Sequence, residues 1–538
     1  MTSKVLLLAL LAIPSLTVAE VNPKNGNFYT IHTDIQQQFS SRYLELTRAY
    51  NAKAAYLGWF GYGWGTSEFE TRLTAMPDGS VAVTENGAGQ INFYRPTKTA
   101  DIAEGVAKMA SSIAITDHLS PSDEAALRDK LLNNESLRLQ KVERYGLKYP
   151  LPMAATLQGR SCPQNLLTRV VEGYKRKGCQ GRIDLFDLEG RLIRQEFDDG
   201  YAVSVIYEGN RPKVIQDTLG QAMTFSWTAN GLAETVADSK NTARYNYDDQ
   251  NNLIKSHDMN GNIYEYKYDN KHNMTALVYL DHTRMTMTYD EDSAVTSVTE
   301  RDGNKTTYDY RYDPQDGLHY WTRITLTKPN GESASHEFEF KSHVDAKGTE
   351  ILTKAAESTA IDHRESQYDD KGRVIHQVNG EGESVDYDYD KHCGKLSRVV
   401  LNKDEITTFD YDQACNLKSA EKNHQNRIAL QYYINRIGDN ESPLIKRMID
   451  YDLTKKTKRI LTFKYNKQHK PVEINLVGVG RIRVEYDANG EISNVKSNKG
   501  LKMALQVTRA FQSLLSVVKV AGICMSLLGP ENIMTAPK

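Results

Sequence analysis

Hydrophobic and polar residues alternate along most of the chain after residue 180, in short segments that recur at a nearly fixed interval. In one such segment, Tyr264, Tyr266 and Tyr268 alternate with polar residues, which is the period of a strand with one buried face. An Asp follows the last tyrosine and begins a polar stretch that suits a tight turn, because Asp hydrogen-bonds its own backbone. A second short strand completes the unit. Each unit therefore predicts one β-hairpin.

The pair Tyr-Asp marks this repeat. It occurs at Tyr247-Asp248, Tyr268-Asp269 and Tyr289-Asp290, and a fixed period of this kind indicates a repeat architecture. About fourteen units predict on the order of twenty-five strands, far more than the roughly ten of an open twisted sheet, so we expect the sheet to coil. Further copies are Tyr312-Asp313, Tyr368-Asp369, Tyr389-Asp390, Tyr411-Asp412, Tyr465-Asn466 and Tyr486-Asp487, a looser unit surrounds Phe340, and degenerate copies are Phe186-Asp187, Tyr207-Glu208 and Trp227-Thr228.

The Tyr-Asp array over residues 180–490 resembles the YD repeats of Rhs proteins, of the shell-forming components of Tc toxin complexes and of teneurins. The sequences NPKNGN (22–27), TRAYN (47–51) and LGWFGYGW (57–64) are similar to the domain that precedes the repeats in many bacterial Rhs proteins. The resemblance implies a spiral β-sheet around a hollow interior. The expected fold class is mainly β: a coiled antiparallel YD-repeat sheet that forms a partial shell, with an N-terminal β cap domain, a helical insert and a C-terminal helix.

The segment Met1–Ala19 predicts a secretory signal peptide. Lys4 precedes the apolar run Val5–Ile13, and the small-residue ending Thr17-Val-Ala19 suits cleavage before Glu20. A membrane anchor fits less well, because the run is too short to span a bilayer. We expect a mature chain that is periplasmic, exposed on the outer surface or secreted. The expected divisions are 1–19 signal peptide, 20–100 N-terminal β domain, 101–150 helical insert, 151–180 linker, 181–495 repeats and 496–538 C-terminal helix and tail.

The helical insert begins with clear helix signals. An earlier helix is expected over 102–113. Ser120 is placed to cap the next, Pro121 suits its first position, and Gly146 is placed to end the helical stretch. The sequence leaves three roles open for this insert: a lid, a plug or a docking arm.

The stretch Leu501–Leu528 predicts a second helical element, about 28 residues and therefore about 42 Å long. Its polar residues form a narrow stripe on an otherwise apolar rod. Three places are open for it: inside the hollow of the sheet, docked into a partner, or in a membrane. Membrane contact is not favoured, because Lys519 lies in the most apolar part. The polar stripe is Lys502, Gln506, Arg509, Ser513, Ser516 and Lys519.

Aromatic rings are the candidate binding residues. Trp59, Tyr62 and Trp64 lie in a glycine-aromatic cluster and could stack on sugars, but packing against the end of the sheet is favoured over binding, since sheet edges are usually covered. The tyrosines of the strands supply ring faces and hydroxyls suited to glycan or protein contact. The strand candidates are Tyr264, Tyr266 and Tyr268.

Five cysteines in an exported chain raise the question of disulfides. Cys162 and Cys179 are the preferred pair because they flank a polar linker. Cys393 and Cys415 occupy the same place in consecutive repeats, two strands apart. The spacing of neighbouring strands then predicts about 9.5 Å between them, whereas a disulfide needs Cα atoms within about 7 Å. Cys524 is left over, and free thiols stay open for all five.

Composition and motifs argue against catalysis and against nucleic acid as a partner. The chain has 67 basic and 69 acidic residues and so lacks a global field that would attract nucleic acid. Its 31 Tyr against 13 Phe favour thin β-structure with amphipathic rings on a solvated face. We find no catalytic motif, no metal site and no cofactor site. The family resemblance suggests self-cleavage near Asp313-Pro314 only faintly, because further repeats follow.

These observations predict an exported, non-enzymatic YD-repeat scaffold for surface interaction, adhesion or binding of glycans or proteins, one that could enclose another chain. The expected partners are a protein or glycan at the cell surface, a second shell-forming chain, or another copy. The alternative is an Rhs-type toxin-delivery protein whose C-terminal helix is the cargo or grips it.

Overall fold

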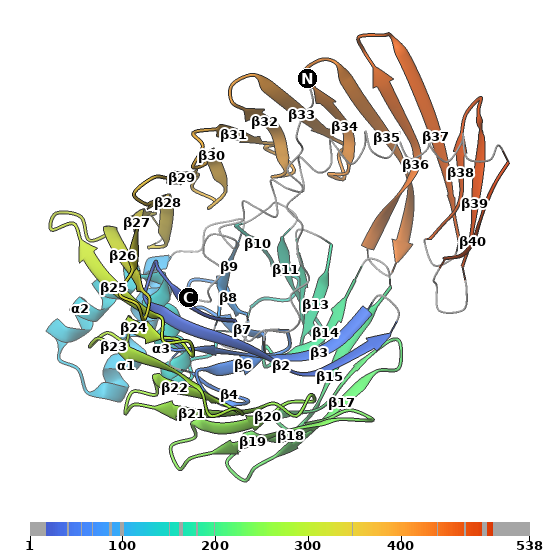
Figure 1. Cartoon of the computed structure of the whole chain (residues 1–538). Helices are drawn as coiled ribbons and strands as arrows, with labels where there is room; N and C mark the ends of the chain where they lie inside the picture. The colour runs from blue at the N-terminus through green and yellow to red at the C-terminus, as the bar shows by residue number, and fades with distance from the viewer. Residues whose placement is uncertain are drawn as a thin grey trace.

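The computed structural model describes residues 18–498, apart from 40–41, 55, 67, 86–88, 97–101, 150, 161–164, 179–180, 198–199, 347, 438–439, 467–469 and 487–491. One antiparallel sheet dominates it and runs in chain order from β7 (Arg72–Ala75) to β40 (Ile492–Ser497). The sheet winds around a central space and does not close (Figure 1). The expected fold class, a coiled antiparallel repeat sheet forming a partial shell, is confirmed.

The first winding of the sheet is narrow. Leu73 donates its N–H to the Gly190 carbonyl at 2.8 Å, so that β7 meets the turn before β14. A side chain at Gly190 would collide with the Leu73 carbonyl. The turn before β14 can therefore approach β7 this closely only because it has a glycine there. The winding contains β7, β8 (Val81–Thr84), β9 (Ile91–Pro96), β10 (Thr156–Gly159), β11 (Leu166–Val170), β12 (Gly173–Lys177), β13 (Ile183–Phe186) and β14 (Leu192–Glu196).

The spiral therefore begins earlier than the sequence indicated. Residues 72–96 were expected in the N-terminal domain and 156–177 in a linker, yet both ranges are strands of the spiral. Their units lack the Tyr-Asp marker, so the repeat was not visible there. A separate apolar core, which includes Val83, Leu157 and Phe186, fills this winding.

The remaining strands are the YD-repeat hairpins. Each pairs with the next in an antiparallel register, so the expectation of one hairpin per repeat is confirmed. The strands are β15 (Ala202–Glu208), β16 (Arg211–Asp217), β17 (Ala222–Trp227), β18 (Ala233–Ala237), β19 (Thr242–Tyr247), β20 (Leu253–His257), β21 (Ile263–Tyr268), β22 (Met274–Tyr279), β23 (Arg284–Tyr289), β24 (Val295–Thr299), β25 (Lys305–Tyr312), β26 (His319–Thr327), β27 (Ser333–Val344), β28 (Glu350–Ser358), β29 (His363–Tyr368), β30 (Val374–Val378), β31 (Ser384–Tyr389), β32 (Leu396–Leu401), β33 (Glu405–Tyr411), β34 (Leu417–Lys422), β35 (Asn426–Ile437), β36 (Asn440–Asp452), β37 (Thr457–Tyr465), β38 (Pro471–Leu476), β39 (Gly480–Tyr486) and β40.

A small N-terminal sheet lies on the inner face of the first repeats. Its strand order is β1 (Val18–Asn22), β2 (Asn27–Phe39), β3 (Arg42–Asn51) and β6 (Trp64–Thr66), and β4 (Leu57–Gly58) with β5 (Gly61–Tyr62) forms a short hairpin. One apolar core joins this sheet to the inner face of β15–β24, with residues such as Phe28, Leu46, Val203 and Leu277. Figure 1 shows the blue strands β2, β3 and β6 inside the curve of the green repeats.

Three helices connect β9 to β10. They are α1 (Ile102–Asp117), α2 (Pro121–Leu132) and α3 (Glu135–Tyr145). The Ser120 hydroxyl accepts the N–H of Asp123 at 3.2 Å, and Gly146 ends α3 with φ of 60°, so both predicted signals are confirmed. Asn134 caps α3 and divides the predicted second helix into two. In the part of the chain that the structure describes, no helix is both long and apolar enough to cross a membrane.

The tyrosine of most Tyr-Asp pairs connects its hairpin to the preceding one; Tyr312 and Tyr368 are exceptions among the described pairs. The strand register shifts at this tyrosine, as at Tyr268 opposite Met274. The Tyr289 hydroxyl donates to the carbonyl of Met274, the residue opposite the previous tyrosine, at 2.7 Å. The rings therefore point inward with their hydroxyls bonded to the backbone, and the expectation of a solvated aromatic face is wrong for these repeats. The same bond joins Tyr207 to Leu192, Tyr268 to Leu253, Tyr310 to Val295, Tyr389 to Val374, Tyr411 to Leu396, Tyr432 to Leu417 and Tyr486 to Pro471.

The aspartate of the pair holds the turn. One carboxylate oxygen of Asp248 accepts the N–H groups of Gln250 at 2.9 Å and Asn252 at 2.8 Å, as the turn chemistry predicted. Asp313 accepts the N–H of Gln315 at 2.9 Å in the same way, so the Asp313-Pro314 dipeptide lies in an ordinary turn between β25 and β26.

A disulfide joins Cys393 and Cys415, with Cα atoms 5.4 Å apart. The prediction that these cysteines lie too far apart was wrong. It assumed equal turns at the strand spacing, but the turn after Asp390 closes on Lys395, one residue later than the equivalent closure of Asp412 on Asn416. The longer turn brings its cysteine close to the next one. The preferred pair, Cys162 and Cys179, and also Cys524 lie outside the described residues.

Candidate functional site

A buried ion pair fixes the N-terminal sheet to the repeats. Arg48 on β3 and Asp34 on β2 are both fully buried and form a two-bond contact, of which the Nη2–Oδ1 bond is 2.9 Å. Two repeat residues complete the cluster: Ser256 Oγ accepts from Arg48 at 3.0 Å, and the Tyr245 hydroxyl donates to Asp34 at 2.8 Å. Burial, the largest single effect, would lower the pKa of Arg48, but the charge and hydrogen bond of Asp34 together with Tyr266 and Tyr245 outweigh it and hold the pKa well above its ordinary value.

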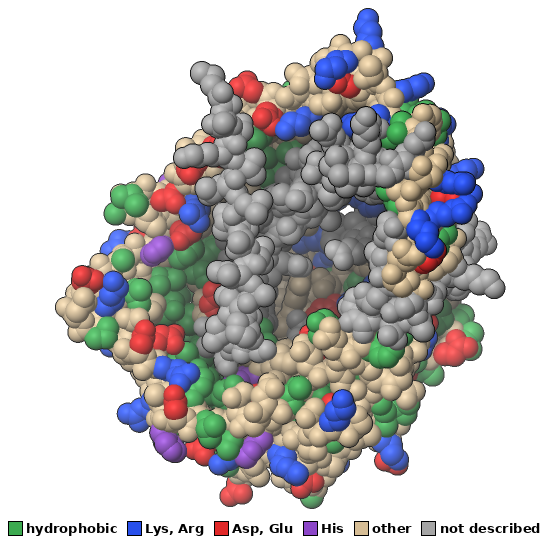
Figure 2. Space-filling view, turned by 45° about the vertical axis from the view of Figure 1, so that its right-hand side comes forward, with side chains coloured by type: hydrophobic (Ala, Val, Ile, Leu, Met, Phe, Trp, Pro, Cys, Tyr) green, Lys and Arg blue, Asp and Glu red, His purple; other side chains and the backbone are tan. Residues whose placement is uncertain are grey.

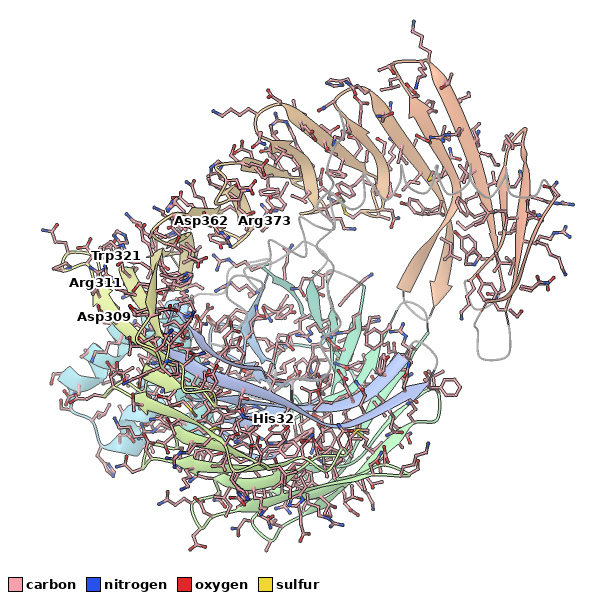
Figure 3. All side chains as sticks on the ribbon, viewed as in Figure 1. His32, Asp309, Arg311, Trp321, Asp362 and Arg373 are labelled. Atoms are coloured by element: carbon pink, nitrogen blue, oxygen red, sulfur yellow. A yellow bond between two sulfur atoms is a disulfide. The ribbon has the colours of Figure 1, made fainter. Side chains whose placement is uncertain are left out.

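His32 lies beside this ion pair, on the side of β2 that meets β21 (Figure 3). Its ring is 4.4 Å from the ring of Tyr264 and 5.7 Å from that of Trp64. Burial, followed by the charge of Arg48, lowers the pKa of His32 well below its ordinary value. The imidazole is therefore neutral in the folded protein at physiological pH.

The candidate aromatic residues lie in the same interface. Trp64 is fully buried and donates its indole N–H to the Tyr268 hydroxyl at 2.9 Å. Its ring is 5.2 Å from that of Tyr266, which is also buried. Tyr62 stacks on His272 at 3.9 Å. The structure therefore uses these rings to pack the N-terminal sheet against the repeats, and none of these contacts leaves an open platform for a sugar.

Trp59 makes the equivalent contact further along the sheet. Its ring lies 5.9 Å from that of Phe225 and 6.3 Å from that of Trp227, and its carbonyl accepts the N–H of Ala233 at 2.8 Å. The packing interpretation of the glycine-aromatic cluster, favoured from the sequence, agrees with this geometry.

The buried side chain of Glu70 holds the glycine-aromatic segment by hydrogen bonds. Its carboxylate accepts the Tyr56 hydroxyl, the N–H of Trp59 at 3.0 Å and the N–H of Thr66 at 3.2 Å. Burial raises the pKa of Glu70 to about 7, against the lowering effect of these donors and of Arg72. Its ionised form is therefore costly although it has three donors.

The helical insert contacts the turn between β27 and β28. Glu135, at the start of α3, donates its N–H to the Gly348 carbonyl at 3.2 Å and accepts the Thr349 hydroxyl at 2.8 Å. Arg95 on β9 binds the same carboxylate at 2.6 Å. The first winding thus touches a repeat that comes much later in the sequence. These contacts make the insert a brace between the first winding and a later turn, and they leave open the choice among a lid, a plug and a docking arm.

The inner face of the later repeats, β26–β40, is apolar and differs from that of the earlier ones. A second core cluster contains Phe340, Tyr387, Val399, Met448 and others, and every member, buried or partly buried, comes from residues 320–484. No residue of the N-terminal sheet belongs to it. In the described part of the chain, the core of this face, here called the arc face, therefore consists of residues of its own strands. Only its first strands also meet the N-terminal segment, where the Thr322 hydroxyl donates to the Pro23 carbonyl at 2.7 Å. Figure 2 shows the molecule hollowed at its centre.

The outer face of the same strands carries charges. Asp309, Arg311 and Trp321 lie at the outer side of β25 and β26 (Figure 3), and Arg311 and Arg323 both pair with Glu337. Such exposed pairs contribute little stability each. His392, Cys393 and Cys415 are a grouping with metal-ligand spacing among the described residues, but the two sulfur atoms are bonded to each other, so this geometry does not favour a metal.

Two family models match the sequence. One is a domain of unknown function (DUF6531) over residues 19–93, and the other is the RHS Repeat over residues 247–284. The second covers the hairpins β20–β22, whose tyrosine and aspartate bonds are repeated along the sheet. The chain therefore carries the repeat of the Rhs/YD-repeat family. No curated protein matches this Rhs sequence.

Several solved structures are similar to this Rhs protein. In the Tc holotoxin pore of Photorhabdus luminescens, the match has 11% identity and a TM-score of 0.37 and covers 88% of this chain and 24% of that one. In TcdB2-TccC3 without its hypervariable C-terminal region, it has 12% identity and a TM-score of 0.37 and covers 89% and 30%. This chain thus spans less than a third of either, and likeness of this degree carries no argument about function.

Sequence reasoning missed the polar residues that hold the Rhs core together. Asp34, Arg48, His32 and Glu70 stand in ordinary alternating strands or next to them, and no spacing marks them as partners. Their partners in the repeats, Tyr245 above all, lie far away in the sequence. Only the folding of the N-terminal sheet onto the repeats brings them together.

Proposed function

We propose that this protein is an exported, non-enzymatic Rhs-type scaffold that holds a polypeptide against the arc face. The observation that supports the proposal is the difference between the two halves of the inner face. The N-terminal sheet packs on the inner face of β15–β24, whereas the core of the arc face contains only its own strands in the described part of the chain. An apolar sheet face requires a covering layer in water.

A polypeptide suits this face better than a glycan. The hydroxyls of Tyr389 and Tyr411 donate to backbone carbonyls and are therefore not offered to a sugar. Between the rings lie aliphatic side chains such as Val399 and Leu461. Such a surface suits the apolar side of an amphipathic helix.

The segment 501–528 is the occupant to which the proposal commits. It follows closely after the end of β40 at Ser497, the last strand of the arc. Its length, about 42 Å if helical, is enough to cross several strands at about 4.8 Å spacing. An apolar rod and an apolar face then cover each other.

The test compares two truncations of the purified protein. Removal of residues 501–538 is expected to lower the midpoint of thermal unfolding and to increase binding of an apolar dye, whereas the matched control that lacks only 531–538 should behave like the full chain. A synthetic peptide of residues 501–528 should then bind the longer truncation in trans and restore its unfolding midpoint.

Unchanged stability together with no binding of the peptide would refute the proposal. If the longer truncation folds normally and loses only toxicity toward target cells, the segment is a cargo, and the delivery alternative replaces the scaffold. N-terminal sequencing of protein recovered outside the cytoplasm tests export, which the proposal takes from residues 1–19; cleavage elsewhere, or none, would count against it.

A further inference from the structure

A cavity of about 350 Å³ lies where the N-terminal sheet ends on the inner face of the repeats. Its walls come from both layers. Val21 and Phe28 belong to the N-terminal sheet, and Val298, Ile324 and Phe338 belong to β24, β26 and β27. Pro23, Glu20, Glu300 and Tyr308 complete the lining. The volume is within the range of small-molecule sites, about 300–1,000 Å³.

Tyr308 occupies a position whose hydroxyl is bonded in two earlier repeats. It stands two residues before Tyr310, whose hydroxyl bonds the preceding hairpin, as Tyr245 and Tyr266 stand two residues before Tyr247 and Tyr268. The Tyr245 hydroxyl donates to Asp34, and the Tyr266 hydroxyl bonds Ser256 at 2.9 Å. The Tyr308 hydroxyl forms no hydrogen bond with any described residue. It lines the cavity at the point where the N-terminal sheet no longer supplies a partner.

Two carboxylates line the same cavity without a counter-charge. Neither Glu300 nor Glu20 forms an ion pair with a described residue. Glu20 accepts the Tyr29 hydroxyl. Glu300 is half-buried, and burial, followed by the charge of Asp302, raises its pKa. Both carboxylates also add to the effect of burial in raising the pKa of Tyr308, as expected for charges close to its ring. A half-buried carboxylate without a partner gains from an incoming cation.

We propose that this cavity binds an organic cation, an alkylammonium head on an apolar stem. The ammonium donates to the carboxylates of Glu300 and Glu20 and to the Tyr308 hydroxyl oxygen, and the stem packs against Val298, Ile324 and Phe338. An ammonium has three donors and no acceptor, which matches three oxygen acceptors. The apolar walls disfavour a hard metal ion, since calcium takes six to eight oxygen ligands, and the rings of Tyr308 and Phe338 add cation–π attraction.

The same chemistry has two sources, a free amine or the lysine side chain of a bound polypeptide. The cavity lies at the start of the arc face, with which it shares Phe338, but its ligand is not the segment 501–528, so its test is independent of the proposed function.

The first experiment uses n-hexylammonium as the probe and 1-hexanol as its neutral control, measured by ligand-observed NMR and titration calorimetry on the purified protein. We expect hexylammonium to bind with a dissociation constant of about 1 mM, corresponding to about −4 kcal/mol, and hexanol at least about tenfold more weakly. Glu300→Gln should weaken hexylammonium binding about tenfold or more. The matched control Glu381→Gln, in an exposed turn of the arc, should leave it unchanged.

A second variant protects the test against a folding defect. Ile324→Trp fills the cavity and should abolish binding of both probes, and the far-ultraviolet circular dichroism of each variant is compared with that of the parent. Equal binding of hexanol and hexylammonium, or equal binding by the Glu300→Gln and Glu381→Gln variants, would overturn the proposal.

The second experiment identifies the source. A water-soluble carbodiimide should join a lysine to Glu300 in the purified protein, detected by peptide mass spectrometry, if the cation is a polypeptide side chain. Hexylammonium should then compete with the cross-link. Binding of hexylammonium without any such cross-link excludes a lysine of this chain as the cation. Absence of both hexylammonium binding and the cross-link rejects the site.

Discussion

Two buried titratable side chains of the N-terminal sheet respond to pH in opposite directions. Glu70 has a pKa raised to about 7 by burial, and His32 has a pKa lowered well below its ordinary value, chiefly by burial. Burial therefore favours the neutral form of each. A rise of pH therefore charges Glu70 against the cost of burial, and a fall of pH charges His32 against the same cost. The two effects on the free energy of unfolding therefore oppose each other between pH 4.5 and 6.5, so each has to be measured with a variant that removes one group.

Glu70→Gln tests the first transition. Between pH 4.5 and 7 the folded state binds more protons at Glu70 than the unfolded state does, so the free energy of unfolding falls as the pH rises. From pH 5 to pH 8 this loss amounts to about 2 to 3 kcal/mol for a pKa of about 7. The glutamine variant should lack it in urea unfolding measured at both pH values. An identical pH dependence in the two proteins would show that Glu70 is ionised throughout.

His32→Phe tests the second transition. Below pH 6.5 the unfolded state binds a proton at His32 that the folded state does not, so the free energy of unfolding falls by up to about 1.4 kcal/mol for each pH unit of acidification. The phenylalanine variant keeps a ring beside Tyr264 and Trp64 and should lose that slope. The comparison is made by urea unfolding between pH 5 and 7, and a slope that survives the substitution would assign it to another group.

At the scale of the hairpin, the Tyr-Asp pair performs two separate tasks. The tyrosine bonds its hydroxyl to a carbonyl of the preceding hairpin, and the aspartate binds two N–H groups of its own turn. The first bond acts between units and the second within one. Each unit is therefore attached to its neighbour by more than the strand ladder, as the stability of repeat arrays requires.

Tyr289→Phe tests the contact between units. It removes only the hydroxyl that donates to Met274 at 2.7 Å and leaves a buried carbonyl without that donor, which should lower the free energy of unfolding by about 1 to 2 kcal/mol. Tyr312→Phe is the matched control. The side chain of Tyr312 is 64% exposed, so loss of its hydroxyl should lower the free energy of unfolding by less than about 0.5 kcal/mol. Equal effects of the two substitutions in urea unfolding would contradict a role for the inter-hairpin bond.

At the scale of the molecule, contacts between distant segments determine how the spiral is held. The N-terminal sheet fastens the first repeats, and the helical insert fastens the turn between β27 and β28 to the first winding through Glu135. Arg160 adds a contact to the Asp370 carbonyl at 2.9 Å. After Asp370, the described ion pairs join either neighbouring strands or residues of one turn. Arg398 and Asp388, for example, lie on the neighbouring strands β32 and β31. The final part of the arc should therefore be the part most easily displaced.

Gly348→Ala tests the brace. A Cβ at this position would lie 2.5 Å from the backbone carbon of Asn133, so the turn and the insert must separate. Gly331→Ala is the matched control, because Gly331 has a similar φ, 88° against 79°, and no neighbour within 4 Å. We expect faster amide hydrogen exchange in β27–β29 for the Gly348 variant beyond that of the control, and a larger radius of gyration by small-angle scattering. Equal exchange in the two variants would show that the brace does not hold the arc.

The sequence alone determined the repeated hairpin. Alternation and the Tyr-Asp period are local signals, because one turn and its two adjacent strands lie within a single repeat unit. The turn bonds of Asp248 and the caps at Ser120 and Gly146 were predictable for the same reason. The need for a coiled sheet followed from the number of strands. A disulfide between neighbouring repeats was misjudged, because one extra residue in a turn changes a distance that strand spacing alone had set.

Only the tertiary structure decided which face of the hairpins is buried and by what. Tyr245 and Tyr308 have the same place in their repeats, yet one is bonded to Asp34 and the other lines an open cavity. The difference comes from where the N-terminal sheet ends. Trp64 and Tyr266, expected as candidates for ligand stacking, are buried against each other. Such pairings join residues far apart in the sequence, and local patterns carry no information about them, because they depend on how the whole spiral curves.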